Sequence, residues 1–230
     1  MKNQLIILLS IFCISATFAQ NTLSKKEQKQ GWQLLFDGNS LTNWRAYQNL
    51  NHNWEVKNGV LHNKNNDPNM KVRADLITVK KYKDFAFSCE WIISSGGNSG
   101  IIYRASEEFG QPYYTGPEYQ VIDNEGYNGR LTELQKTAAN YDMEANKNVK
   151  TNKVGTWNKT VIIVKGMDVQ HWLNGKPVLK YEINSENWKA QYENSKWKNE
   201  KKYGQEKEGH IALQDHGHEV WFRNVKIKEL

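Results

Sequence analysis

Hydrophobic and polar residues alternate over many short segments of this chain, and turn residues separate the segments. Trp54 to Lys57 and Val60 to Asn63 flank Asn58-Gly59, which is the strongest short-range signal for a β-hairpin. Asn174-Gly175 predicts a second hairpin further along the chain. Strands of this kind with frequent turns are typical of an all-β sandwich or jelly roll, and the long amphipathic helices of a βαβ fold are missing from the pattern.

Ten further segments carry the same alternation. We predict strands at 33–36, 75–79, 84–94, 99–105, 118–122, 160–165, 168–173, 177–182, 210–213 and 219–228. Two stretches break the pattern. Residues 127–151 are polar and irregular, and loops of that length are uncommon unless they serve a function, so we expect this excursion near the ligand side. Residues 186–208 favour a short peripheral helix that packs Trp188, Tyr192 and Trp197 onto the edge of the sandwich.

The first 19 residues have the order of a secretory signal peptide. A charged start is followed by an apolar run from Leu5 to Ile14 and by small residues that end at Ala19. The run is shorter than the roughly 20 apolar residues of a membrane span. We therefore expect residues 20–230 to form a single soluble domain, exported to the periplasm or secreted. Lipid anchoring at Cys13 is the weaker alternative, because bulky Phe12 precedes it.

Removal of the signal peptide leaves Cys89 as the only cysteine, so no intrachain disulfide can form. Cys89 alternates in phase with Phe85, Phe87 and Trp91, which indicates a buried side chain rather than a reactive thiol. The formal net charge is +6, but the lysines are scattered or interleaved with glutamates, and no nucleic-acid-binding motif is found. Nine Trp and eleven Tyr suit both a sandwich core and the stacking of sugar rings.

A glycine-rich turn at 96–100 leads into a strand. A phosphate-binding loop would lead into a helix and carry a Lys, so this turn does not indicate a nucleotide site. Alternation places Asn98, Gly100 and Arg104 on one face of the strand and Tyr103 on the other, without deciding which face lines a cleft.

Glu118 and Gln120 share a face of the next predicted strand, and Asp123 follows it. The spacing invites comparison with laminarinase-type retaining glycosidases, which carry three acidic residues at these positions. Here Gln120 replaces the middle carboxylate and the last is the shorter Asp123. Retaining hydrolysis needs two carboxyl groups about 5 to 5.5 Å apart, so this chemistry is weakly supported. Solvated polar side chains are the structural alternative.

Near the C-terminus, Gln214 and His216 share a potentially cleft-facing side, with Asp215 between them. A His beside an Asp is suited to general-base catalysis. Asp215, His216 and His218 are also possible ligands of a divalent metal, and a turn with surface histidines is a third interpretation. In the hairpin at 168–182, either His171 or Trp172 could contribute to a cleft wall.

Several of these motifs together resemble one family. The segments 31–38, 97–104, 116–123, 171–175 and 213–224 are similar in order and spacing to the 3-keto-disaccharide hydrolases. The resemblance covers almost the whole mature chain. It implies a concanavalin-like jelly-roll sandwich of two antiparallel sheets, and action on glycosides whose sugar carries a 3-keto group.

A ketone at C3 acidifies the proton on C2, so a base can remove it and the C1 substituent can leave by β-elimination before water adds. We expect His216 or Glu118 to be the base, Asp215 to orient His216, and Arg104 to stabilise the enolate oxygen together with Asn98. Pairing of Arg104 with a carboxylate across neighbouring strands is its structural alternative.

The substrate is expected to contact further polar and aromatic side chains: Tyr103, Gln120, Asp123, His171, Trp172 and Gln214. No cofactor is required, although a divalent metal is possible. A sugar-binding module without activity is the rival function, and the oligomeric state is left open.

Overall fold

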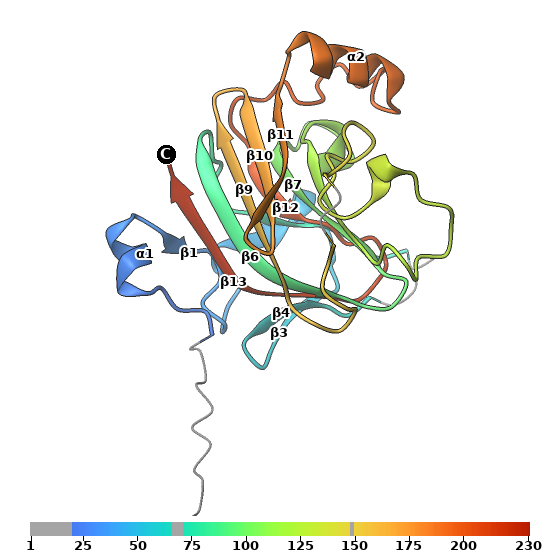
Figure 1. The fold of residues 1–230 in the computed structure, drawn as a ribbon. Coiled ribbons are helices and arrows are strands. Elements are labelled where there is room, and N and C mark those ends of the chain that lie inside the picture. Colours follow the sequence, from blue (N-terminus) through green and yellow to red (C-terminus); the bar gives the residue numbers. More distant parts are fainter. Residues whose placement is uncertain (1–19, 66–70, 148–149) are drawn as a thin grey trace, which may run out of the picture.

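The computed structural model describes residues 20–65, 71–147 and 150–230. Two antiparallel β-sheets pack face to face (Figure 1), which confirms the all-β sandwich. The larger sheet has the order β11 (Lys176–Glu182), β10 (Asp168–Leu173), β9 (Asn158–Lys165), β6 (Phe85–Ile93), β13 (Val220–Glu229), β4 (Val60–Asn63) and β3 (Trp54–Lys57), with β1 (Gln33–Leu34) also paired to β13. The smaller sheet has the order β2 (Trp44–Ala46), β5 (Leu76–Thr78), β12 (His210–Leu213), β7 (Asn98–Ala105) and β8 (Glu118–Ile122). Strand β2 was not predicted from the sequence.

Helices are few and peripheral. Among the described residues they are α1 (Lys25–Lys29), α2 (Glu186–Asn194) and three 3-10 turns, η1 (Tyr47–Asn49), η2 (Pro112–Tyr114) and η3 (Glu133–Gln135). The Ser185 hydroxyl caps α2 by accepting a hydrogen bond from the Trp188 amide. As predicted, Trp188 and Trp197 are buried aromatic anchors of the 186–208 segment. No helix in the described part of the chain is long and apolar enough to cross a membrane.

The main core fills the space between the two sheets. Strand β6 directs Phe85, Phe87, Cys89 and Trp91 inward, as its alternation predicts, and all four are almost completely buried. Burial of one such Phe side chain contributes roughly 1.5–3 kcal/mol. The buried, unpaired thiol of Cys89 agrees with its predicted core role.

The two predicted hairpin turns are present. Asn58 and Gly59 join β3 to β4 with φ angles of 52° and 73°, and Asn174 and Gly175 join β10 to β11 with φ angles of 50° and 80°. Positive φ at both central residues follows the right-handed twist of the strands, and Asn and Gly accept it most readily.

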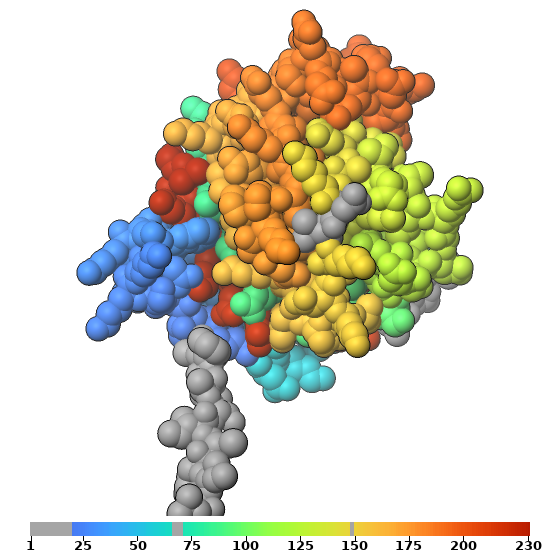
Figure 2. Space-filling view, in the orientation of Figure 1, coloured from blue at the N-terminus to red at the C-terminus, as the bar shows by residue number. Residues whose placement is uncertain are grey.

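The outer face of the smaller sheet is only partly apolar. A second cluster lies there, with Ile77, Ile102 and Ala212 from three neighbouring strands covered by Tyr47. Two long excursions project from the sandwich, one after β8 (lime and yellow) and one that contains α2 (orange), as Figure 2 shows. Both contribute residues to a pocket beside the second cluster.

Candidate active site

A pocket of about 220 Å³ opens over the polar part of the smaller sheet. Its lining comes from the sheet and from the loops around it. The lining residues are Arg73, Asp75, Asn98, Gln111, Tyr113, Glu118, Gln120, Tyr141, Lys196, Gln214, Asp215 and His216. Six of the eleven predicted site residues are therefore brought together: Asn98, Glu118, Gln120, Gln214, Asp215 and His216.

Strands β7 and β8 position Glu118. Tyr119 and Val121 point into the core, so the alternation turns Glu118 and Gln120 to the pocket. In the antiparallel register, Gly100 lies opposite Gln120 and diagonal to Glu118. A Cβ atom at Gly100 would lie 2.1 Å from the Glu118 Oε1 atom. The glycine thus provides the space in which the Glu118 carboxyl group lies.

Asp75 and Asp215 form a second acidic group in the pocket. The Asp215 amide donates a hydrogen bond of 2.9 Å to Asp75 Oδ1. The Asp215 Oδ1 atom accepts from the Gly217 amide at 3.0 Å and from Asn65 Nδ2 at 3.3 Å. Within the described part of the chain, the Oδ2 atoms of both aspartates are buried without a hydrogen-bond partner. No hydrogen bond between described residues joins Asp215 to the His216 ring.

Three further polar atoms of the pocket have no hydrogen-bond partner in the described part of the chain. Asn98 Oδ1, Gln214 Oε1 and His216 Nδ1 are also buried without a partner among the described residues. Most buried polar groups in proteins are hydrogen-bonded, so a concentration of unpaired ones in one pocket indicates a site built for a polar ligand.

Burial raises the pKa values of two pocket carboxyl groups. The pKa of Glu118 rises to about 8, mainly through desolvation, with the Lys196 ammonium opposing the rise and Asp75 adding to it. The pKa of Asp75 rises to about 7, again mainly through desolvation. Near neutral pH the pair therefore holds at least one proton, which is a favourable condition for proton transfer.

His216 has the opposite shift. Burial, together with the neighbouring His218 and Arg73, lowers the pKa of His216 to about 4, so its ring is neutral at pH 7. Arg73 Nη1 donates to the backbone carbonyl of His216 at 3.3 Å. A neutral imidazole offers one donor and one acceptor to a ligand.

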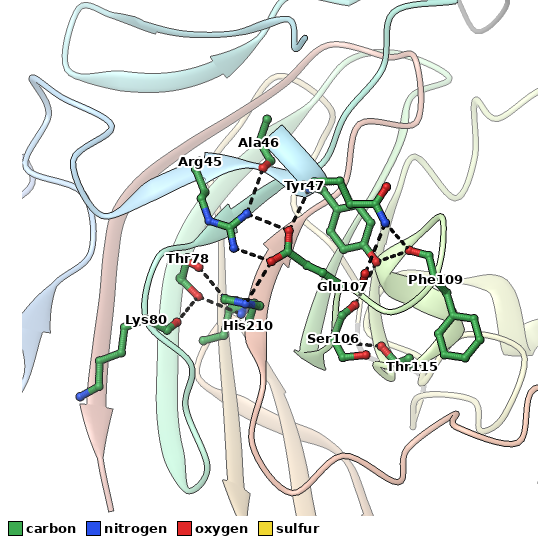
Figure 3. A network of polar contacts seen from close by, with 12 residues as sticks. Arg45, Ala46, Tyr47, Thr78, Lys80, Ser106, Glu107, Phe109, Thr115 and His210 are labelled. Carbon is green, nitrogen blue, oxygen red and sulfur yellow. Dashed lines mark hydrogen bonds and ion pairs between the residues drawn. The ribbon is translucent and has the colours of Figure 1, made fainter. Parts of the chain in front are cut away.

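The loop at 106–116, which carries Gln111 and Tyr113, is fastened at its start by a polar network (Figure 3). The Arg45 guanidinium donates to both carboxylate oxygens of Glu107, at 2.8 and 2.5 Å. The single hydroxyl proton of Tyr47 is shared between the backbone carbonyls of Ser106 and Phe109, which both lie within hydrogen-bond distance. The ion pair lowers the pKa of Glu107 to about 2. This network fixes the loop beside the pocket.

Two predicted site residues belong to the core instead. Tyr103 and His171 are completely buried between the sheets. The Tyr103 hydroxyl is 3.0 Å from His171 Nε2 and also hydrogen-bonds Tyr181, and His171 Nδ1 is 3.0 Å from the Ala138 carbonyl. Tyr103 and His171 are therefore not part of the pocket lining, because alternation identifies residues that share a face without showing which face is inward.

Arg104 is also misplaced by the prediction. Its φ angle is +55°, at a bulge where β7 pairs with β12. The bulge interrupts the alternation, and the side chain is buried away from the pocket, donating to the Lys83 carbonyl from Nε at 3.0 Å and from Nη2 at 2.7 Å. It also pairs with Asp84 at 3.3 Å. Arg104 therefore pairs with a carboxylate, as its structural alternative expects, but Asp84 precedes β6 of the other sheet rather than lying on a neighbouring strand. Arg104 is not part of the pocket lining.

Asp123 and Trp172 are outside the pocket as well. One carboxylate oxygen of Asp123 accepts from the amides of Glu125 and Gly126, and the other from the amide of Gly96. These bonds close the turns at the ends of β7 and β8. Trp172 lies on β10 of the other sheet, where its Nε1 donates to Gln170. Neither residue is part of the pocket lining.

Six pocket residues were missed by the sequence analysis: Arg73, Asp75, Gln111, Tyr113, Tyr141 and Lys196. Asp75 was detectable, because it alternates with Ile77 at the start of a predicted strand. The other five lie outside the strands, where no periodicity applies. Tyr141 does come from the 127–151 excursion that was expected near the ligand side.

Asp215, His216 and His218 are the residues of the metal interpretation. No group of three or more His, Cys, Asp or Glu side chains with metal-binding geometry occurs among the described residues. His216 and His218 stack with ring centroids 5.9 Å apart.

Comparison with known proteins extends the evidence from the pocket. The sequence profile of the 3-keto-α-glucoside-1,2-lyase-like domain matches residues 31–228. The chain belongs to this family. Another relative of this lyase-like domain is a protein of Bacteroides thetaiotaomicron named 3-keto-disaccharide hydrolase. It is 31% identical over 228 residues, which cover 87% of this chain and 79% of that protein.

Solved structures with a similar fold include one of substantial sequence identity. A crystal structure described as a putative glycosyl hydrolase from Parabacteroides distasonis is 36% identical, with a TM-score of 0.85 over 92% of this chain and 100% of that chain. A family GH16 endo-β-1,3(4)-glucanase, SCLam, shares the fold alone, with 10% identity and a TM-score of 0.51 over 87% of this chain and 92% of its own.

Proposed function

We propose that this protein cleaves 3-keto-glycosides by elimination followed by hydration. The observation that carries the proposal is the pairing of Glu118 and Asp75 in one pocket, where burial raises the pKa of both carboxyl groups toward neutrality. The family and the Bacteroides relative named 3-keto-disaccharide hydrolase support the proposed substrate class.

The reaction needs one proton acceptor, one proton donor and a stabilised oxyanion. A base takes the C2 proton, and the electron pair moves toward the C3 carbonyl to form an enolate. The enolate collapses into a C1=C2 double bond as the C1–O bond breaks, and the leaving oxygen takes a proton. Water then adds its oxygen to C1 and a proton to C2. The net result is hydrolysis of the glycoside.

In this scheme, Glu118 is the base and Asp75 is the acid, and the reacting form is the singly protonated pair whose proton lies on Asp75. The higher pKa of Glu118 makes this the minor of the two singly protonated forms. The cation of Lys196 favours ionisation of Glu118, whereas the neighbouring carboxylate of Asp215 favours the protonated form of Asp75. His216 was the other candidate base. Its pKa of about 4 makes it a weaker base than Glu118, and its neutral ring suits a hydrogen bond to a sugar hydroxyl.

The amides of the pocket orient the sugar. Asn98 is the first residue of β7, and its side-chain amide nitrogen is assigned to donate a hydrogen bond to the substrate carbonyl. Gln120 and Gln214 offer donors and acceptors to the ring hydroxyls. Tyr113 and Tyr141 supply ring faces of the kind that pack on sugars.

A retaining glycosidase mechanism is less well supported. Asp123, which would be the acid in the laminarinase arrangement, is occupied by three backbone amides and is absent from the pocket lining. Gln120 is neutral and cannot replace a carboxylate helper. Elimination does not depend on either of these groups.

The decisive experiment compares a 3-keto-disaccharide with its unoxidised parent in heavy water, with products followed by NMR. We expect cleavage of the keto sugar alone and deuterium at C2 of the released sugar. Glu118→Gln should be inactive while still binding, and Glu208→Gln, at an exposed position, serves as the matched control. Cleavage of the parent sugar would support a conventional glycosidase. Binding of both sugars without cleavage would support a binding module.

The proposed mechanism needs no metal ion. We expect turnover to survive exhaustive chelation, because protein side chains carry out every step of the proposed mechanism. If chelation abolished activity and added zinc or magnesium restored it, this expectation would be contradicted. We also propose export to the periplasm or beyond the cell. The predicted signal peptide at 1–19 lies outside the described residues, and N-terminal sequencing of the secreted protein tests cleavage after Ala19.

A further inference from the structure

Lys196 reaches the pocket from the excursion that contains α2. Its backbone amide donates a hydrogen bond of 2.7 Å to Asp142 Oδ2, which fixes the start of the side chain. The ammonium nitrogen lies 4.2 Å from the ring centroid of Tyr141 and 4.3 Å from that of Trp197. Two aromatic rings therefore hold this cation at the pocket wall.

The supporting rings are themselves firmly placed. Trp197 is only 2% exposed, and its indole Nε1 donates to the Tyr141 carbonyl at 3.0 Å. Trp197 also stacks on Tyr203 with centroids 4.8 Å apart and planes 9° apart, and Tyr203 stacks on Trp188. The position of the ammonium is thus set by the buried aromatic core of the excursion, although the Lys196 residue is exposed overall.

The charge of Lys196 is not neutralised by a close partner. Among the described residues, no carboxylate lies within ion-pair distance of its Nζ atom, whereas Arg45, Arg104 and Arg223 each have one. A ring face attracts a cation without supplying a negative charge. The ammonium keeps its hydrogen-bond donors for another group in the pocket.

We propose that Lys196 binds the C3 oxygen of a 3-keto sugar and stabilises the negative charge that forms there when the C2 proton is removed. This inference rests on the proposed function and gives Lys196 the role that the sequence analysis assigned to Arg104. A fixed cation beside a developing oxyanion accelerates the reaction because little reorganisation is needed. Arg73, the other cation in the pocket, donates to the His216 carbonyl and is assigned to holding that segment.

The test separates proton removal from bond cleavage. The substrate is a 3-keto-glucoside whose C1 substituent is attached through carbon, so no group can leave, and exchange of its C2 proton with heavy water is followed by NMR. We expect Lys196→Met to lower the exchange rate about 100-fold to 1000-fold, the range for losing one oxyanion donor. Lys196→Arg should restore part of the rate, because it keeps the charge with a different geometry. Lys198→Met, two residues along and exposed, is the matched control and should exchange at the wild-type rate.

The outcomes distinguish the inference from the proposed function. Wild-type exchange with a large loss in Lys196→Met, at an unchanged melting temperature, supports the role of Lys196. Equal exchange by Lys196→Met and wild type overturns that role while leaving the proposed function standing. Absence of both exchange and cleavage in the wild type overturns the proposed function, and the inference falls with it.

Discussion

The backbone amide of Asp215 donates a 2.9 Å hydrogen bond to the carboxylate of Asp75. This bond ties the segment after β12 to the start of β5 and places two acidic side chains in the same pocket. The Asp75 carboxyl is fully buried, and both desolvation and the charge of Asp215 raise its pKa, while the hydrogen bond opposes the rise. An arrangement that disfavours ionisation in this way reduces stability at alkaline pH, and a polar ligand site is a physical reason for its presence.

Asp75→Asn should make stability less dependent on pH. The folded-state pKa of Asp75 is about 7, above its ordinary value in the unfolded chain, so protonation of Asp75 stabilises the fold. That contribution is complete below the unfolded pKa and is lost as the pH rises through 7. The wild-type melting temperature should therefore fall between pH 5 and pH 8. We expect Asp75→Asn to fall by clearly less, as measured by calorimetry across this range.

A control is needed because Glu118 contributes with the same sign, its pKa being raised to about 8. Glu118→Gln should also flatten the curve, over a range that extends past pH 7 to about pH 8. The exposed-site variant Glu208→Gln should follow the wild type. Identical curves of melting temperature against pH for all four proteins would show that folding raises the pKa of neither Asp75 nor Glu118.

The rate of turnover should have a bell-shaped pH profile with limbs near 7 and 8. Below the lower value both carboxyl groups are protonated and no base is available, and above the upper value both are ionised and no acid is available. Maximal kcat/KM is expected where the pair holds one proton. Asp75→Asn should lose the alkaline limb and lower the rate by roughly 100-fold or more. A profile that stays flat from pH 5 to 9 would contradict catalysis by this pair.

The sequence predicted the residues of the pocket that lie on regular strands. Glu118, Gln120 and Gln214 share the outer face because alternation has a period of two, and that rule holds along β8 and β12. It fails at Arg104, where a bulge with positive φ changes the side-chain direction.

Loop residues could not be placed in this way. Tyr113 comes from the 106–116 loop and Lys196 from the excursion that contains α2. Both contact the ring of Trp197, a residue far from Tyr113 in sequence. The sequence shows that such residues are aromatic or basic. Their location depends on tertiary contacts that no local pattern encodes.

Gly100→Ala should impair catalysis more than folding. The new methyl group would lie 2.1 Å from Glu118 Oε1, so the carboxyl group must move from its present position. Displacement of a catalytic base by about 1 Å lowers rates on the order of 100-fold. Gly110→Ala is the control, because its added methyl group would meet nothing within 4 Å. Kinetics on a 3-keto-disaccharide should show the loss for Gly100→Ala alone; wild-type kcat in that variant would show that Glu118 does not need this space.

Glu107→Gln should weaken substrate binding by loosening the loop that carries Gln111 and Tyr113. The change removes the charge from a two-point contact with Arg45 that is about one-third exposed, so we expect a loss near 1 kcal/mol. That energy corresponds to a rise in KM of roughly fivefold, with little change in kcat. Glu108→Gln, an exposed neighbour, is the control. A fall in kcat at constant KM would indicate that the loop takes part in the chemical step.

Arg104→Gln should destabilise the fold and leave the chemistry intact. The guanidinium is buried, makes two hydrogen bonds to the Lys83 carbonyl and pairs with Asp84, which also accepts from the Gly166 amide. Its removal takes two donors from the Lys83 carbonyl in a partly buried position, at a cost of about 1–3 kcal/mol. For a domain of this size, each kcal/mol lowers the melting temperature by roughly 2–4 °C. Arg130→Gln, at an exposed position, should melt with the wild type.

The same variant separates the two roles considered for Arg104. Because its side chain is directed to the start of β6 rather than to the pocket, kcat on a 3-keto-disaccharide should stay within about twofold of wild type at a temperature where Arg104→Gln is folded. Arg104→Lys should recover little stability, since one ammonium cannot reproduce the forked contact with the Lys83 carbonyl. A hundredfold loss of kcat without a lower melting temperature would restore Arg104 to the catalytic site and would remove the reason for assigning the enolate charge to Lys196.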